Sequence, residues 1–552
     1  YALGHKKMSK YSKIQLRGLV LQAVLKFKDC NLPNDKEIKS CIKFLNDLDE
    51  KEFVVSLLLK EISPHSTQYD SILTLLLFSV SDEKTLSEQI FKLLNDKNIS
   101  DFKKMHLINI LRESGQSIDY NFIQTHIDNP DAIIDSETKK FLQDAQLSPE
   151  VLIDFFDFYF TVNADDKSML VNSIINDYSG DELANILEPF AYFYPTICVD
   201  ENILNAYLES KSYLALKPLK WCSEHLSDDN LLKIAKKNYK KMLLLGLDKN
   251  KKDCEIFSNF LSDSKPMNFW FSCADGNSNI SCVFARHRDN GFIQTFFTVF
   301  NLSSGPIASF GFNEITKRDF NVILMRFFKS SLHAKISLKD GKTIFDTLAS
   351  RGWKDNVKIP YEFVCWRRLT YDVEQSSCSF SELLTQGLKK ISVNKKVVSE
   401  FLNTDLFSSW FFNCKKAPPI LEVIETLVQN MPNHIDEINL MVENAANKLF
   451  SDLNFKNKFI EKILFQSYIL LKSNMPNAAN SLYSLTFDDN LVFEFLLTIT
   501  KKSLYFYFVN ELYEQENNSS NIFVKNAPDQ ENSDFVKKIL RVIEEQWVLR
   551  EE

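Results

Sequence analysis

Arginine is concentrated in one central stretch of this 552-residue chain. Seven of the eleven arginines and six of the twelve glycines lie between residues 264 and 375, whereas lysine is the usual cation elsewhere. The planar guanidinium group donates paired hydrogen bonds to carboxylate and phosphate, which the point charge of lysine cannot do. The stretch is therefore a candidate recognition surface. Its arginines are Arg286, Arg288, Arg318, Arg326, Arg351, Arg367 and Arg368.

Four of these arginines stand out as candidate site residues. Arg286 and Arg288 are two apart in a predicted strand and so lie on one side of it, and Arg367 and Arg368 follow Trp366. Aromatic side chains and arginine together are typical of interface hot spots. We predict that these five residues bind a partner or an anion. An alternative, that the cations pair internally and hold the central segment against its neighbours, explains the same residues slightly better.

Catalytic and metal-binding patterns are absent from the sequence. The eight histidines and ten cysteines are scattered, without HExxH, CxxC, GxGxxG or GxxxxGK[ST] spacing. His287 and His333 could work with Cys273, Cys282 or Asp275 only if the fold brought them together. We therefore expect no catalytic residue, no metal and no cofactor. The cysteines are expected to be mostly buried, reduced thiols of a cytoplasmic protein.

Two local clusters have a functional and a structural interpretation. The stretch 275–279 resembles a calcium loop, but Ile280 stands where such a loop needs glycine and Arg286 where it needs glutamate. We predict a hairpin turn there. The densest lysine cluster could contact nucleic acid or an acidic membrane, although a solvated face is the simpler interpretation. It consists of Lys236, Lys237, Lys240, Lys241, Lys249, Lys251 and Lys252.

The elements around the arginines are predicted to be short strands followed by helices. Runs rich in Phe, Val, Ile and Trp are separated by Asp-Gly, Asn-Gly and Gly-Pro turn signals. We expect strands at 267–274, 280–286, 292–302 and 307–312, a helix capped by Thr316, a strand at 334–338, a turn at Asp340-Gly341, a helix at 343–351 and a helix or strand at 360–371. These form one small α+β domain.

Amphipathic segments dominate the rest of the chain. From residue 12 to about 260 they are 10 to 17 residues long, and acidic helix starts recur 33 residues apart at 49–53 and 82–86. Ser148-Pro149-Glu150 predicts another helix start, and Ser179 with Glu182 predicts a capping box. Pro189 should bend the helix that follows. A second helical arm begins with a capping box at Ser379 and Glu382 and continues with Ile420, Ile424, Leu427 and Met431.

These features resemble HEAT-type repeats, whose first helix is often kinked by proline. The resemblance rests on period and patterning, and it implies a scaffold that binds partners along a concave surface. The predicted fold is mainly α, with two α-solenoid-like arms around a small central α+β domain that combines an antiparallel sheet with helices. The boundaries are 1–263 for the first arm, 264–375 for the central domain, 376–513 for the second arm, 514–533 for a linker and 534–552 for a final helix.

Charge supports the same division. The central domain has 15 Lys and Arg against 10 Asp and Glu, so its net charge of about +5 contrasts with about −13 in the remainder of a chain whose total is −8. No apolar run is long enough to cross a bilayer. We predict a non-enzymatic cytoplasmic scaffold or adaptor that binds protein partners and belongs to a larger assembly. The alternatives are an enzyme or small-anion sensor with its pocket where the central domain meets the arms, and a nucleic-acid-associated helical protein.

Overall fold

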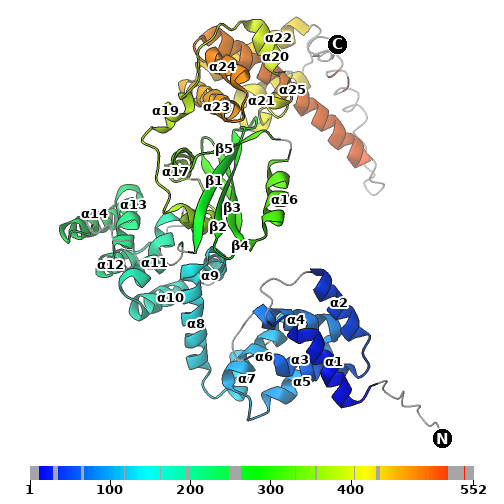
Figure 1. Ribbon diagram of the computed structural model, residues 1–552. Coiled ribbons are helices and arrows are strands. Elements are labelled where there is room, and N and C mark those ends of the chain that lie inside the picture. Colours follow the sequence, from blue (N-terminus) through cyan, green and yellow to red (C-terminus); the bar gives the residue numbers. More distant parts are fainter. Residues whose placement is uncertain are drawn as a thin grey trace. The chain divides into compact units, whose positions relative to one another are not determined.

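The protein is mainly α-helical and contains one small five-stranded antiparallel sheet (Figure 1). The predicted fold class is therefore confirmed, as far as mainly α with a small α+β region. The chain forms two compact units, residues 1–141 and 142–552. The domain boundaries predicted from the sequence stay predictions. The computed structural model describes residues 11–28, 35–63, 68–116, 118–161, 163–193, 199–247, 261, 263–329, 331–354, 357–402, 404–429, 435–519, 537 and 540.

The first unit is built from short amphipathic helices around an aliphatic core. The predicted start at 82–86 is confirmed, because the Asp82 carboxylate caps α5 by accepting from the Thr85 amide at 2.9 Å. Leu57, Leu58, Leu73, Leu76 and Leu107 are among the buried side chains. The helices are α1 (Lys13–Leu25), α2 (Asp35–Asn46), α3 (Lys51–Glu61), α4 (Gln68–Val80), α5 (Glu83–Leu94), α6 (Asp101–Glu113) and α7 (Tyr120–His126). The unit boundary falls within α8 (Pro130–Leu147).

The second unit opens with another set of helices. They are α9 (Pro149–Thr161), α10 (Ala164–Asp177), α11 (Gly180–Leu187), the 3-10 helix η1 (Glu188–Tyr192), α12 (Glu201–Glu209), η2 (Tyr213–Ala215), α13 (Leu216–His225) and α14 (Asp229–Leu244). The predicted start at Pro149 is confirmed. The capping box at Ser179 is wrong, because its hydroxyl makes no cap bond. Pro189 does not kink a continuous helix, since α11 ends two residues earlier and η1 takes over.

The sheet is a meander of four strands with a fifth strand added at the other edge. Its strands are β1 (Ser264–Ser272), β2 (Asn279–Arg288), β3 (Ile293–Asn301), β4 (Gly305–Ile315) and β5 (His333–Ile336), in the spatial order β4-β3-β2-β1-β5. All neighbours are antiparallel. The hairpin predicted at 275–279 is confirmed, because the Asp275 carboxylate accepts the Asn279 amide at 2.8 Å.

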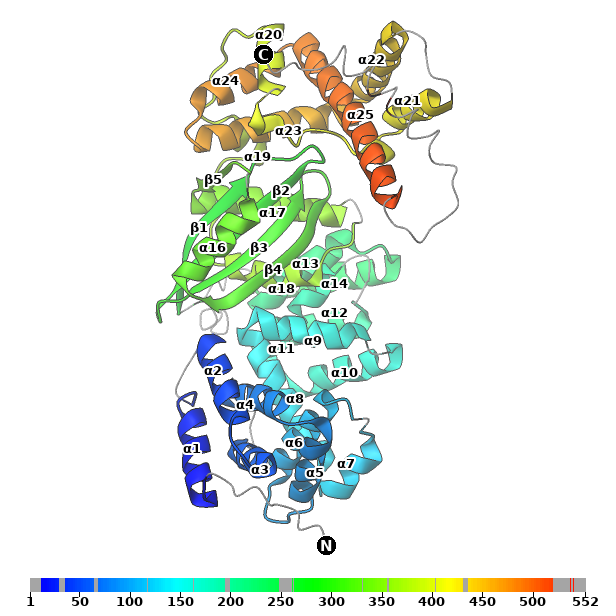
Figure 2. The same cartoon turned by 90° about the vertical axis from the view of Figure 1, so that its right-hand side faces the viewer.

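Helices cover both faces of the sheet. Figure 1 shows α17 (Leu338–Lys354) and α16 (Lys317–Phe328) on opposite sides, and Figure 2 views the face that carries α16. On the α17 side, Phe345 packs against Phe269, Phe296 and Phe300. On the α16 side, Phe297 contacts Phe327. Adjacent phenylalanines in β3 thus fill two different cores, as strand alternation requires.

The remaining elements connect the sheet to a second helical layer. After α17 come α18 (Tyr361–Trp366) and η3 (Arg367–Thr370). The second layer contains α19 (Phe380–Thr385), α20 (Lys395–Leu402), η4 (Asp405–Phe407), η5 (Cys414–Lys416), α21 (Pro418–Gln429), α22 (Ile435–Ser451), α23 (Leu453–Lys472), α24 (Pro476–Leu485) and α25 (Asp489–Ser519). Ser379 and Glu382 form the predicted capping box. Ile420, Ile424 and Leu427 are buried as predicted, and Met431 lies outside the described residues.

Two further sequence predictions are wrong. Asp340-Gly341 is not a turn but part of α17, where Gly341 allows the helix to approach β1: a Cβ there would lie 2.5 Å from the Phe269 ring. Glycine is required here by the close packing of α17 on β1, and not by the backbone conformation. Helix α25 continues to Ser519, so the first residues of the predicted linker are helical. The predicted final helix at 534–552 lies almost wholly outside the described residues. Among the helices described, none is long and apolar enough to span a membrane.

The role of Gly341 gives a first test. Gly341→Ala should lower the free energy of unfolding of the second unit by about 1–3 kcal/mol, because the new methyl group overlaps the Phe269 ring. Urea unfolding followed by tryptophan fluorescence reports on this unit alone, since all six tryptophans lie in it. Gly18→Ala in α1 is the matched control, because no atom lies within 4 Å of its Cβ. It should stabilise its helix by about 0.5–1 kcal/mol in circular dichroism. Equal effects would contradict the packing argument.

Candidate functional site

Arg286, the first predicted site residue, is completely buried and makes five internal hydrogen bonds. Its guanidinium donates to the Ser264 hydroxyl and carbonyl at 2.9 and 3.0 Å and to the Leu369 carbonyl at 2.9 Å. Two further bonds reach the Asp372 carboxylate, at 2.7 and 2.9 Å. A guanidinium group has five N–H donors, so none is left for a ligand. Arg286 joins β1, β2 and the segment after η3.

Arg288 points to a different place. Its guanidinium is paired with Asp263 and with Glu314, the latter at 3.1 Å, and its side chain is 22% exposed. These contacts tie the end of β2 to the residue before β1 and to the end of β4. The two arginines therefore do not form a common anion site, although they lie on the same strand.

Arg367 and Arg368 face the helices that precede the sheet. Arg367 donates to Glu188 at 2.7 Å and lies 3.8 Å from the Tyr192 ring. Arg368 donates to the Asn185 carbonyl at 3.0 Å, with its Nε 3.9 Å from Glu188. Burial opposes the charge of Arg367, but the Glu188 carboxylate together with Tyr371 and Tyr192 outweighs that effect and holds the pKa of the guanidinium above its usual value. One buried carboxylate thus serves two buried cations.

Trp366 is buried against β4. Gly311 of β4 makes this possible, because a Cβ there would lie 2.6 Å from the indole ring. Its indole Nε1 is buried without a hydrogen-bond partner among the described residues. Of the five predicted site residues, four are buried and Arg288 is partly covered. Arg367 and Arg368 contact the helices that precede the sheet, as the alternative explanation requires, whereas the partners of Arg286 lie within the central domain itself.

The histidines of the central domain lie at opposite ends of the sheet. His287 is opposite Lys265 at the start of β1, and His333 is opposite Ser272 at its end. Seven residues of strand separate them, about 23 Å. His333 stacks on Phe328 with ring centroids 4.2 Å apart. Burial raises the pKa of the Cys282 thiol well above its ordinary value. These groups cannot act together as nucleophile and base.

Aromatic rings fill the junction between the central domain and the helices of the second unit that precede it, η1 and α13. Trp221 stacks on His225 at 3.6 Å, and the Trp353 indole donates to the Tyr192 carbonyl at 2.6 Å. The cavity left beside them measures about 30 Å³, room for one or two water molecules. It is too small for the substrate or small-anion pocket considered from the sequence. The described residues contain no cluster of potential metal ligands.

A buried lysine that sequence reasoning missed holds the sheet to the second helical layer. Lys462 of α23 is 2% exposed, donates to the Gly276 carbonyl at 2.7 Å and lies 4.0 Å from the Trp410 ring. The Trp410 indole donates to the Ala274 carbonyl at 2.8 Å, and the Gln466 side chain accepts from the Ala274 amide at 3.0 Å. The sequence signal was a lysine and a glutamine four residues apart on the apolar side of a helix.

Burial lowers the pKa of Lys462 to about 7, and the negative charge of Asp275 opposes this shift. Lys462 lies beside the β1–β2 turn, where the backbone of the turn closely approaches the backbone at Phe411. A Cβ on Gly276 would be 2.1 Å from the Phe411 carbonyl oxygen. Water therefore has little access to the ammonium group, and the neutral amine is favoured.

The exposed members of the arginine cluster were not those selected from the sequence. Arg318 and Arg326 lie on the outer side of α16 and make no ion pair with any residue that the structure describes. Met325 of the same helix is 65% exposed, and Phe310 of β4 is 44% exposed. Exposed arginine and apolar side chains, the composition expected of a binding surface, are therefore present on the central domain, but at residues other than the five predicted ones. A helical wheel of α16 would have placed Arg318 and Arg326 apart from the residues that pack against the sheet.

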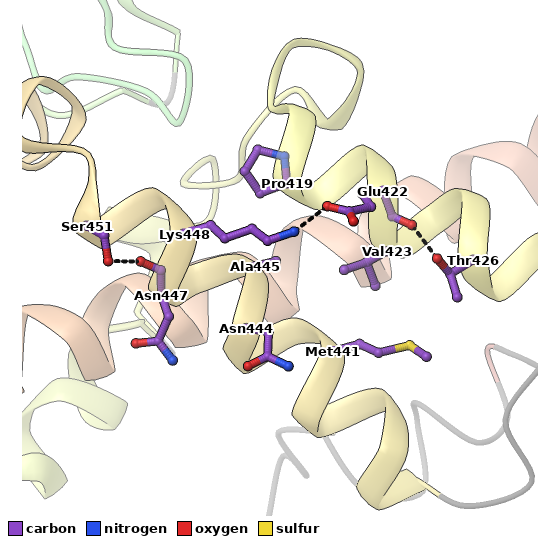
Figure 3. A pocket seen from close by; sticks show the side chains of 10 residues that line it. All are labelled: Pro419, Glu422, Val423, Thr426, Met441, Asn444, Ala445, Asn447, Lys448 and Ser451. Carbon is purple, nitrogen blue, oxygen red and sulfur yellow. Dashed lines mark hydrogen bonds and ion pairs between the residues drawn. The ribbon is translucent and has the colours of Figure 1, made fainter.

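An open groove with a volume of about 690 Å³ lies between α21 and α22 of the second helical layer (Figure 3). Val423, Ala445 and Met441 supply apolar surface, of which Val423 and Ala445 are buried. The rim is polar and includes Glu422 and Lys448, which form an ion pair at 2.6 Å. The other lining residues are Pro419, Thr426, Asn444, Asn447 and Ser451.

No protein-family model, curated protein or solved structure matches the chain.

The shared carboxylate of Glu188 gives a second test. Glu188→Gln should destabilise the second unit by about 3–5 kcal/mol, because two guanidinium groups would remain buried without a counter-charge. Glu422→Gln removes one partner of an exposed ion pair and should change stability by less than about 1 kcal/mol. Urea unfolding of both variants measures the difference. Similar values for the two would show that the buried network contributes little.

Lys462 gives a third test, through pH. Unfolded lysine titrates near 10.4, whereas burial lowers the pKa to about 7 in the fold. Between these values the unfolded chain binds a proton that the folded chain has released. The free energy of unfolding should thus be lowest below about pH 7 and rise towards pH 10, by on the order of 4 kcal/mol.

Tryptophan fluorescence in urea, repeated across this pH range, measures the slope. Lys462→Met should flatten the rise, while Lys448→Met, at an exposed site, should leave it unchanged. An unaltered slope in Lys462→Met would contradict the assignment.

Proposed function

We propose that this chain is a non-enzymatic scaffold or adaptor of the HEAT-like helical-repeat type, which binds a protein partner on its helical surface. The observation that carries the proposal is the groove between α21 and α22 (Figure 3). Buried apolar residues below a polar rim are the usual anatomy of a protein interface. A groove between two helices can receive a helix of a partner, which places its apolar side chains in it.

The dimensions of the groove suit a short helix. Its α22 wall runs from Met441 to Ser451, about 15 Å at the rise of an α-helix. Leu440, on the same helix, is 59% exposed and extends the apolar surface at one end. The Glu422–Lys448 pair is more than half exposed on both sides, so it contributes little stability and can exchange partners at low cost.

The exposed arginine and aromatic side chains of the central domain supply a second possible contact. Arg326, Met325 and Phe310 are the residue types enriched at interfaces. The buried network around Arg286 and Glu188 supports this role indirectly, because it joins sheet and helices into a rigid platform. We further propose a cytoplasmic assembly as the setting, for which the seven free cysteines among the described residues are support.

Site-specific photo-crosslinking tests the proposal. A benzophenone amino acid replaces Asn444, which lines the groove, or Asn457, an exposed asparagine of α23, in the full chain expressed in its own host. We expect a discrete crosslinked protein from position 444 and none from position 457.

A competing substitution completes the test. Asn444→Arg should fill the groove and reduce co-purification of that protein by about tenfold, as expected for a blocked interface centre. Asn457→Arg should have no effect. Equal crosslinking from both positions, or unchanged co-purification in Asn444→Arg, would refute the groove as the binding site.

A further inference from the structure

Helix α14 carries five lysines on its exposed side. None of them forms an ion pair or hydrogen bond with any other described residue, whereas Lys220 on neighbouring α13 pairs with Glu224. Lysines at i and i+4 on one helix repel each other and destabilise it by a few tenths of a kcal/mol. Among the described residues, the helix thus keeps an unneutralised positive stripe at a small cost in stability. Its lysines are Lys233, Lys236, Lys237, Lys240 and Lys241.

Two strongly exposed leucines continue this stripe. Leu244 is 87% exposed and Leu245 is 56% exposed. Because residues four apart lie one turn apart on the same side, Lys236, Lys240 and Leu244 form one line along the helix. Lys237, Lys241 and Leu245 form a second line beside it. Each line is about 12 Å long.

The leucines border a shallow hollow rather than a flat surface. Its volume is about 390 Å³, and its lining consists of Leu208, Glu209, Lys211, Lys241, Leu244 and Leu245. Leu208 and Glu209 come from the end of α12, so two helices shape the hollow. An apolar hollow at the end of a cationic stripe fits a ligand with an apolar anchor at one end and negative charges along the next turns.

We propose that α14 binds an acidic amphipathic segment of a protein, with its carboxylates along the lysines and an apolar side chain in the hollow of Leu208, Leu244 and Leu245. Two observations favour such a segment over a larger polyanion. The chain as a whole has a net charge of −8, which opposes adsorption to nucleic acid or an anionic membrane. A short segment experiences only the field within about 8–10 Å of the stripe. Exposed leucines, moreover, add nothing to phosphate binding.

Fluorescence anisotropy with the full chain tests this proposal. The probe is a labelled helical peptide of about 16 residues, with glutamates spaced four apart and leucines at one end. We expect saturable binding at about 50 mM salt that weakens as salt screens the charges. Lys236→Glu with Lys240→Glu should weaken it by about tenfold or more, and Leu244→Ser also by about tenfold. The same peptide with glutamine in place of glutamate should bind the unaltered chain no more tightly than the glutamate peptide binds these variants.

Matched controls lie elsewhere on the same unit. Lys317→Glu with Lys458→Glu reverses two other exposed lysines, and Leu453→Ser alters a leucine that is 69% exposed; both should leave binding unchanged. Vesicles of phosphatidylcholine with about 30% phosphatidylserine and single-stranded RNA of about 20 nucleotides test the other ligand classes. Binding of vesicles or RNA in preference to the peptide would overturn the proposal. So would absence of peptide binding at low salt, or equal losses in the controls.

This surface is separate from the groove between α21 and α22. Asn444→Arg should not alter peptide binding to α14, and the α14 variants should not alter crosslinking from position 444. Failure of one proposal therefore leaves the other standing.

Discussion

The desolvation of buried charge is the constraint on which the second unit depends. A guanidinium group removed from water must have its N–H donors satisfied, or the fold loses several kcal/mol. Arg286 meets this requirement with five bonds to Ser264, Leu369 and Asp372. Since these partners come from β1, from η3 and from the residue Asp372 after it, the sheet cannot form its full set of contacts without that segment in place. One side chain thereby couples distant parts of the sequence.

Buried charge is treated differently at the two junctions between sheet and helices, and at the first the Nε of Arg367 is buried without a hydrogen-bond partner among the described residues. Towards the first helices, charge is kept and shared, because Glu188 faces both Arg367 and Arg368. Towards the second helical layer, Arg351 keeps its charge by pairing with Glu461 of α23 at 2.6 Å, whereas Lys462 has little counter-charge nearby and burial lowers its pKa to about 7. The first junction should therefore be insensitive to pH near neutrality, whereas the second changes its protonation state there.

Local signals account for the parts of the fold that were predictable. Asp275 and Gly291 stand in hairpin connections and Gly305 directly follows one; a few adjacent residues determine each of them, and the strands between them alternate or run apolar. Gly341 shows the limit of such reasoning, because it resembles a turn signal while its role is to admit the Phe269 ring. The sequence does not distinguish inner from outer arginines for a related reason. Asp372, Glu188 and Glu314 are remote in sequence from the arginines they neutralise, and no spacing rule connects them.

Hydration accounts for part of the distribution of the two cations, although Lys462 is buried and Arg318 and Arg326 are exposed. Arginine is weakly hydrated and its fork matches carboxylates, so it tolerates burial, and Arg286, Arg367 and Arg368 accordingly lie inside. Lysine is strongly hydrated, and the lysines of α14 remain in solvent. A local excess of arginine is therefore as much a sign of buried ion pairs and hydrogen bonds between packed elements as of a binding surface. Once these buried contacts are set aside, the described surface that can still recognise a partner consists of the unpaired lysines of α14, the outer arginines of α16 and exposed apolar side chains.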